Sequence, residues 1–100
     1  MEQNLSLYYV FHTVAKKGSI SHAAKELYIS QPAISRAIKK LENNLDTVLF
    51  KRNSRGVTLT VDGEILFQHT SAAFDTLMEG EEILARHHAL GVDQLRIGVS

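Results

Sequence analysis

The sequence of 100 residues contains no cysteine and a single proline. Without cysteine the chain cannot form a disulfide, a thiolate zinc site or a thiol nucleophile, and it suits a reducing compartment. It also lacks an apolar run long enough to span a membrane and a basic segment followed by an apolar run, as in a secretion signal. We therefore expect one cytoplasmic domain with a modest hydrophobic core and no membrane partner.

The formal net charge is zero, but the charges are separated along the chain. Residues 16–60 contain nine basic and three acidic residues, a net charge of +6. Residues 61–100 contain seven acidic and two basic residues, a net charge of −5, and Glu2 brings the total to zero. The first half can be attracted to a polyanion that would repel the second half. An uneven surface that is merely solvated is the alternative at this point.

Two helices are predicted at the start of the chain. Apolar residues recur at three- and four-residue steps over residues 5–17, as in a helix with one buried face. Gly18 is suited to end that helix, and Ser19 or Ser21 can cap a second, short helix that ends near Tyr28.

A third helix is predicted to begin at Ser30, because this residue can cap it and Pro32 lies in its first turn, where a missing N–H costs nothing. Its two faces differ in chemistry. A helical wheel places Ile34, Ala37, Ile38, Leu41 and Leu45 on an apolar stripe, and Pro32, Ser35, Arg36, Lys39 and Asn43 on the opposite face.

After Asp46 the pattern becomes alternating. Residues 48–52 and 57–60 are predicted to form a small hairpin around a turn at residues 53–56. Thr60 can cap a last helix over residues 61–90, for which Gly91 is a natural stop. The tail, residues 94–100, alternates like a strand and suggests the beginning of a second domain.

The third helix and the hairpin predict a helix-turn-helix with a wing, in which the helix enters the major groove of DNA. Gln31 can pair with adenine, Arg36 can reach guanine or phosphate, and Ser35 can contact either. Pro32 and Ala33 are small enough to pack on a thymine methyl group. The alternative is that this face is simply the solvated side of an ordinary helical bundle.

Further basic residues lie in the third predicted helix and in the hairpin. Lys39, farther along the helix, is better placed for phosphate, and the hairpin adds Lys51, Arg52 and Arg55 in a segment too short for a core. Arg55 beside Gly56 at the turn suits insertion into a narrow minor groove. Its alternative role is that of a solubilising loop charge.

Several linked motifs occur in a fixed order. They are Phe11-x-x-Val14-Ala15, Gly18-Ser19, Ala23-Ala24-x-x-Leu27, Ser30-Gln31-Pro32-Ala33-x-Ser35-x-x-Ile38-x-x-Leu41-Glu42, Leu49-Phe50-x-Arg52 and Leu59-Thr60-x-x-Gly63. Over residues 5–90 this order closely resembles the N-terminal DNA-binding region of LysR-type transcriptional regulators. The resemblance implies a mainly α fold, with a winged helix-turn-helix made of three helices and a two-stranded hairpin, followed by a long dimerisation helix.

The resemblance also assigns residue roles and segments. Base-reading positions match Gln31, Pro32, Ser35 and Arg36, phosphate-contacting caps match Ser30 and Thr60, and the wing-tip arginine matches Arg55; we add Lys39 and Arg52 as backbone contacts. We expect a DNA-binding domain at 1–60, a linker helix at 61–90 and the start of an effector-binding domain at 91–100. Asp46 departs from the family's usual glycine, so it must adopt left-handed backbone geometry at some cost.

The last helix carries an imperfect coiled-coil seam, which predicts a homodimer. Its positions are Leu66, Ala73, Leu77, Gly80 and Leu84. The alternative is that this side packs back on its own domain. A higher oligomer of the full-length protein is also possible.

No catalytic or metal-binding set is recognised. His87 and His88 are adjacent, so their side chains point about 100° apart on a helix, and no further ligands accompany them. We expect no enzymatic activity and no cofactor in this segment, with a small-molecule effector only on a C-terminal domain that is missing here. The expected function is sequence-specific binding of double-stranded DNA, to a pseudo-palindromic operator as a dimer. A non-specific nucleoid-type binder and a protein–protein adaptor that uses the long helix are the alternatives.

Overall fold

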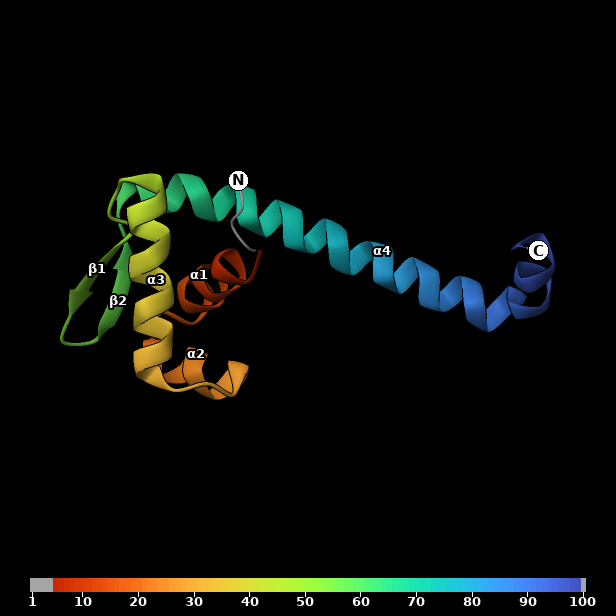
Figure 1. Cartoon of the computed structure of the whole chain (residues 1–100), viewed down its shortest axis with the longest axis horizontal. Helices are drawn as coiled ribbons and strands as arrows, with labels where there is room; N and C mark the ends of the chain where they lie inside the picture. Colours follow the sequence, from red (N-terminus) through yellow and green to blue (C-terminus); the bar gives the residue numbers. More distant parts are fainter. Residues whose placement is uncertain (1–4, 100) are drawn as a thin grey trace.

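The computed structural model describes the backbone of residues 5–99 and the side-chain surroundings of residues 5–90. Three helices come first, followed by a two-stranded antiparallel sheet and one long helix (Figure 1). The elements are α1 (Leu5–Lys17), α2 (Ile20–Leu27), α3 (Gln31–Leu45), β1 (Phe50–Asn53), β2 (Gly56–Leu59) and α4 (Val61–Val99). This is the mainly α, winged helix-turn-helix architecture that the sequence predicts.

Local capping chemistry sets where α2 and α3 begin. Ser19 caps α2, because its Oγ accepts the His22 N–H at 3.1 Å, and Ser21 does not take this role. Ser30 caps α3, accepting the Ala33 N–H at 3.2 Å, with Pro32 in the first turn. The predicted starts of both helices are therefore confirmed.

Left-handed residues set where these helices end. Tyr28 ends α2 with φ 58°, and Asp46 ends α3 with φ 57°. A non-glycine residue in this region pays a steric cost, which backbone hydrogen bonds from the cap partly offset. Asp46 donates its N–H to the carbonyl of Asn43. Asp46 therefore adopts the left-handed backbone geometry that we expect where the family usually has glycine.

The hairpin formed by β1 and β2, the wing, is shorter than predicted. Phe50 pairs with Leu59 and Asn53 pairs with Gly56, so a two-residue turn connects the strands. Val48 precedes β1 and is exposed. The wing approaches Gly18 closely at Gly56, where an added Cβ would collide with the Gly18 carbonyl oxygen, and the Val57 N–H donates to that oxygen at 3.3 Å.

Two clusters of buried side chains form one continuous core beneath α3. The first joins α1, α2, α3 and the wing through Val10, Val14, Ala23, Ala24, Ile34, Ile38 and Val57. The second comprises Leu7, Phe11, Leu41 and Leu49, with Leu66 and Phe67 of α4 packed against it. Phe50 and Ala37 touch both clusters. The core therefore fixes both α3 and the wing in place.

The beginning of α4 is capped as predicted, but its end is different. Thr60 accepts the Gly63 N–H at 3.0 Å. The helix does not stop at Gly91 and continues to Val99, so the strand expected over residues 94–100 is wrong for its described part. A helix satisfies its backbone hydrogen bonds internally, whereas a single strand requires a partner strand. No helix in the described part of the chain is both long and apolar enough to cross a membrane.

Candidate nucleic-acid interface

The outer face of α3 presents most of the predicted base-reading residues to solvent. Gln31, Pro32 and Arg36 are exposed, whereas Ala33 and Ser35 are half-buried. The inner face is fixed by Ile34, which is fully buried. A rigid helix with a small and polar outer face is the form that the major groove accommodates.

The helical-wheel prediction of a buried stripe is wrong for Leu45, the last residue of α3. Leu45 is 40% exposed, because α3 ends at this residue and the chain turns away at Asp46. No other part of the described fold therefore covers the Leu45 side chain fully. The earlier stripe residues Ile38 and Leu41 are buried as predicted.

Gln31, Pro32 and Ser35 line a surface hollow together with Ile20 of α2 and Arg52 of the wing. The fold thus brings a residue of β1 next to three of the predicted base-reading residues. The sequence places Arg52 among the basic hairpin residues but gives no sign that it lies in the same hollow as the start of α3.

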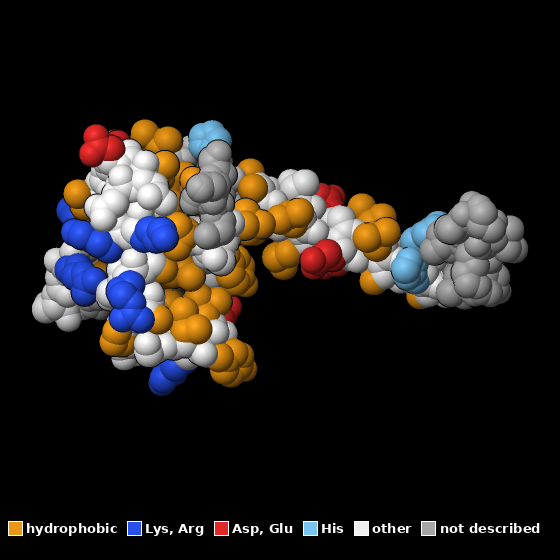
Figure 2. Space-filling model, viewed as in Figure 1, with side chains coloured by type: hydrophobic (Ala, Val, Ile, Leu, Met, Phe, Trp, Pro, Cys, Tyr) orange, Lys and Arg blue, Asp and Glu red, His pale blue; other side chains and the backbone are white. Residues whose placement is uncertain are grey.

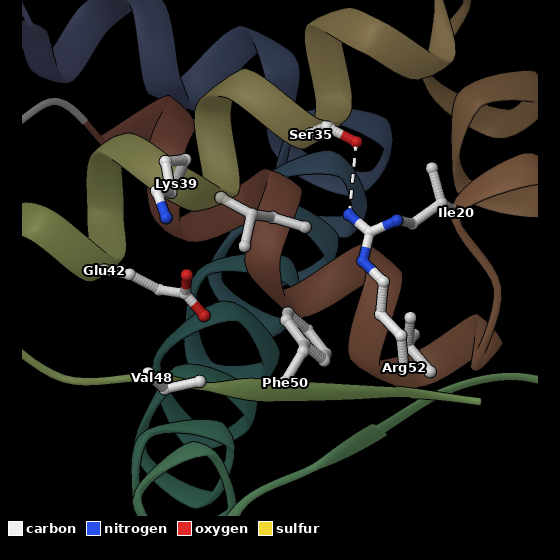
Figure 3. Close-up of a pocket in the computed structure, with 9 residues that line it drawn as sticks. Ile20, Ser35, Lys39, Glu42, Val48, Phe50 and Arg52 are labelled. Carbon is white, nitrogen blue, oxygen red and sulfur yellow. Dashed lines mark hydrogen bonds between the residues drawn. The ribbon is translucent and has the colours of Figure 1, made fainter.

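A cavity of about 250 Å³ lies between α3 and the wing (Figure 3). Ser35, Lys39 and Glu42 line it from α3, and Phe50 and Arg52 line it from β1. Within it Arg52 Nη2 donates to Ser35 Oγ at 3.4 Å. At the other end Glu42 Oε2 accepts the Leu49 N–H at 2.8 Å, which ties α3 to the residue before β1.

The tip of the wing carries Arg55 in an exposed position. Its backbone N–H donates to Asn53 Oδ1 at 2.9 Å, an interaction that fixes the turn while the side chain points to solvent. Lys51 and Arg52 are exposed on the adjoining strand. The three cations predicted for the hairpin therefore lie at the surface.

The two predicted phosphate-contacting caps differ in what their hydroxyl groups can donate. Ser30 Oγ accepts the Ala33 N–H, which uses a lone pair and leaves its proton for another acceptor. Thr60 Oγ1 accepts the Gly63 N–H and donates its own proton to the Val48 carbonyl at 2.7 Å. Thr60 therefore has no hydroxyl proton for a phosphate oxygen while it joins the wing to α4.

The charge separation seen in the sequence is also a separation in space. Lys and Arg side chains gather over α3 and the wing, whereas acidic and hydrophobic side chains lie along residues 75–90, the part of α4 that projects from the other elements (Figure 2). Such an arrangement directs a polyanion to one end of the molecule.

The predicted dimer seam divides into two parts. Leu66 is half-buried and packs on the core of its own domain, as the alternative interpretation allows. Ala73, Leu77, Gly80 and Leu84 are exposed. Thr70 and Phe74 are buried on this stretch of α4 and face α1.

No cluster of three or more metal-ligating side chains occurs among the residues whose surroundings are described. His87 and His88 are exposed, and their ring centroids lie 6.4 Å apart.

The family model for "Bacterial regulatory helix-turn-helix protein, lysR family" matches residues 5–64. The chain belongs to the LysR family. It is 46% identical over 76 residues to the "HTH-type transcriptional regulator PerR" of Escherichia coli, a match that covers 76% of this chain and 26% of that LysR-family relative.

Solved structures agree with this assignment to the LysR family. BenM DBD in complex with catB site 1 DNA has a TM-score of 0.76 and 29% identity, covering 85% of this chain and 94% of that one. CbnR DBD in complex with DNA has a TM-score of 0.71 and 31% identity, covering 87% of this chain and 99% of that one. The chain thus spans nearly all of these two fragments but about a quarter of the PerR protein.

Proposed function

We propose that this chain is the sequence-specific DNA-binding module of a LysR-type transcriptional regulator. The observation that carries the proposal is the shared surface at which Gln31, Pro32 and Ser35 of α3 meet Arg52 of the wing. The similar chains BenM DBD and CbnR DBD were solved in complex with DNA. The module catalyses no reaction and acts in the cytoplasm.

In the proposed complex α3 lies in the major groove and the wing approaches the neighbouring minor groove. Gln31 and Arg36 donate to base edges, while Ser30 and Lys39 contact phosphates. Arg55 is the side chain for the minor groove, whose negative potential attracts a cation at a turn tip. The net charge of +6 over residues 16–60 supplies the salt-dependent part of the affinity.

Arg36→Ala tests this proposal, with Arg86→Ala on the projecting part of α4 as a matched control. Arg36→Ala should cost about 1–3 kcal/mol on a site selected from random DNA and much less on unrelated DNA. Arg86→Ala should leave both affinities unchanged. Fluorescence anisotropy over a series of salt concentrations measures these affinities.

Three results would contradict the proposal or one part of it. An equal loss on all sequences would favour a non-specific, nucleoid-type binder. Retention of function by Arg36→Glu and Arg55→Glu would favour a protein–protein adaptor. A wild-type affinity that does not fall between low and moderate salt would contradict the electrostatic contribution.

We also propose that two copies associate through α4 and read the two halves of a pseudo-palindrome. Leu77 and Leu84 support this, because they are exposed apolar residues on the helix face that continues the seam. Leu77→Asp should convert a dimer at tens of micromolar protein to a monomer in sedimentation, whereas Thr76→Asp, one residue away, should not. A wild-type monomer under these conditions would refute the dimer.

For the whole protein, the expectation of a small-molecule effector bound by a C-terminal domain is part of this proposal. It comes from the family resemblance and from the fraction of the PerR relative that this chain matches, 26%. The chain described here contributes the DNA-reading end and the helix that leaves it.

A further inference from the structure

The contact between Arg52 and Ser35 joins the wing to the recognition helix through side chains. Arg52 lies on β1, where it pairs with Val57, and its guanidinium extends toward α3 (Figure 3). Arg52 Nη2 donates to Ser35 Oγ at 3.4 Å. Both residues also line the hollow that contains Gln31 and Pro32. The guanidinium is therefore next to the face that we propose meets the bases.

Strand β1, which carries Arg52, is held firmly against the core. Phe50, two residues earlier, packs against both core clusters, and the paired residue Val57 is buried. The Val57 N–H also donates to the Gly18 carbonyl at 3.3 Å. The base of this side chain thus has a fixed position relative to α3, unlike that of a residue at the tip of the wing.

The contact restricts the hydrogen bonding of Ser35. A hydroxyl group has one proton to donate and two lone pairs to accept with, whereas a guanidinium can only donate. While Arg52 donates to Ser35 Oγ, the Ser35 proton is directed to a different partner. In the major groove the acceptors are N7 and O6 of guanine, N7 of adenine and O4 of thymine, and the donors are the amino groups of cytosine and adenine.

We propose that Arg52 is a positioning residue that makes Ser35 a hydrogen-bond donor, so that Ser35 selects a base with an acceptor at its major-groove edge. This inference rests on the proposed function, because it requires α3 to lie in the major groove. Without Arg52 the Ser35 hydroxyl group rotates freely, so it can either donate a hydrogen bond to a base or accept one from it. Arg52 would thus set sequence preference through Ser35, in addition to any phosphate contact.

The test compares Arg52→Met, Ser35→Ala and the double variant, with Lys51→Met as a matched control. Lys51 is the preceding exposed cation on the same strand. Sites are selected from random DNA with the wild type, and the affinity of each variant is then measured on the selected site and on its single base-pair changes. Because Arg52 and Lys51 are exposed, circular dichroism should show that the fold is kept in each variant.

We expect Arg52→Met and Ser35→Ala to lose discrimination at the same base pair, by about fivefold each. The double variant should lose no more than either single variant, since the two residues act as a unit. Lys51→Met should weaken binding to all sites equally and reduce the salt dependence by about one counterion.

Two outcomes would overturn the inference. If Arg52→Met behaves like Lys51→Met and its effect adds to that of Ser35→Ala, Arg52 is only a phosphate contact and the proposed function stands. If the wild type selects no sequence at all, the proposed function fails, and the positioning role fails with it.

Discussion

The folded head, residues 5–74, and the projecting part of α4, residues 75–90, use apolar residues in opposite ways. In the head, Phe11, Ile34 and Leu41 are fully buried. In the projecting part, Leu77 and Leu84 are more than half exposed. The head can bury its apolar surface within one chain, whereas a single helix has nothing to fold against.

The transition between the two regions occurs within α4. Phe74 is the last buried residue of the described side chains, and its ring meets Tyr9 of α1 edge to face at 5.3 Å. Thr70, one turn earlier, contacts His12. One uninterrupted helix therefore belongs to the head at its beginning and is available for a partner farther along.

Phe11→Ala should have the largest effect on the head, and Leu84→Ala is its counterpart on the projecting helix. Phe11 is 0% exposed, so the truncation leaves a cavity and should lower the free energy of unfolding by about 3–5 kcal/mol. Leu84 is 59% exposed, and its loss should change the stability at low protein concentration by less than about 0.5 kcal/mol.

Urea unfolding at two protein concentrations measures both effects. If two copies associate through α4 as we propose, Leu84→Ala should remove, at the higher concentration, the extra stability that this association gives to the wild type. Equal losses for the two variants at low concentration would mean that the projecting helix unfolds together with the head, and would end the distinction between the regions.

Two of the glycines of α4, Gly63 and Gly80, sharpen the comparison, because the same substitution should have opposite effects at them. At Gly63 an added Cβ would lie 2.2 Å from the Leu49 carbonyl oxygen and 2.9 Å from Leu59 Cδ2. Gly63→Ala should therefore destabilise the head by about 1–3 kcal/mol. At Gly80 an added Cβ would meet no atom of the described residues within 4 Å apart from the neighbouring backbone of its own helix, so Gly80→Ala should add up to about 1 kcal/mol of helix stability.

Thermal unfolding followed by far-ultraviolet circular dichroism measures both variants. A neutral Gly63→Ala would show that the start of α4 can move away from Leu49. A destabilising Gly80→Ala at high protein concentration, with no effect at low concentration, would place that residue in a close helix–helix contact.

The sequence predicted the features that depend on neighbouring residues. The caps at Ser30 and Thr60 follow from the chemistry of a few adjacent residues, and the left-handed position of Asp46 follows from the glycine that the family usually has there. The burial of Ile34 and Ile38 follows from helical periodicity. The base-reading and backbone roles of individual residues stay predictions.

Features that depend on distant residues were not predictable in this way. Arg52 and Ser35 are 17 positions apart, and His12 and Thr70 are 58 apart, so no spacing rule connects them. The helical state of residues 94–99 was missed because alternating apolar residues also occur in helices, and no strand was available to decide the pairing.

His12 provides the smallest expected effect, at the point where the two regions join. It is buried on α1, stacks on Phe67 with a centroid distance of 5.3 Å, and has Nδ1 3.4 Å from Thr70 Oγ1. Burial lowers the pKa of His12 below its ordinary value of 6.5, and Lys16 lowers it further, while Asp75 raises it.

Because the folded head binds this proton less readily than the unfolded chain, the contribution of His12 to stability should be complete above about pH 6.5 and should fall as the pH drops below it. His12→Gln removes the titrating group, so its stability should decline less between about pH 7.5 and about pH 5.5 than that of the wild type. His22→Gln, which removes an exposed histidine on α2, is the control and should keep the wild-type dependence. Urea unfolding at the two pH values measures the difference, and identical slopes for wild type and His12→Gln would mean that protonation of His12 does not loosen the junction between the head and α4.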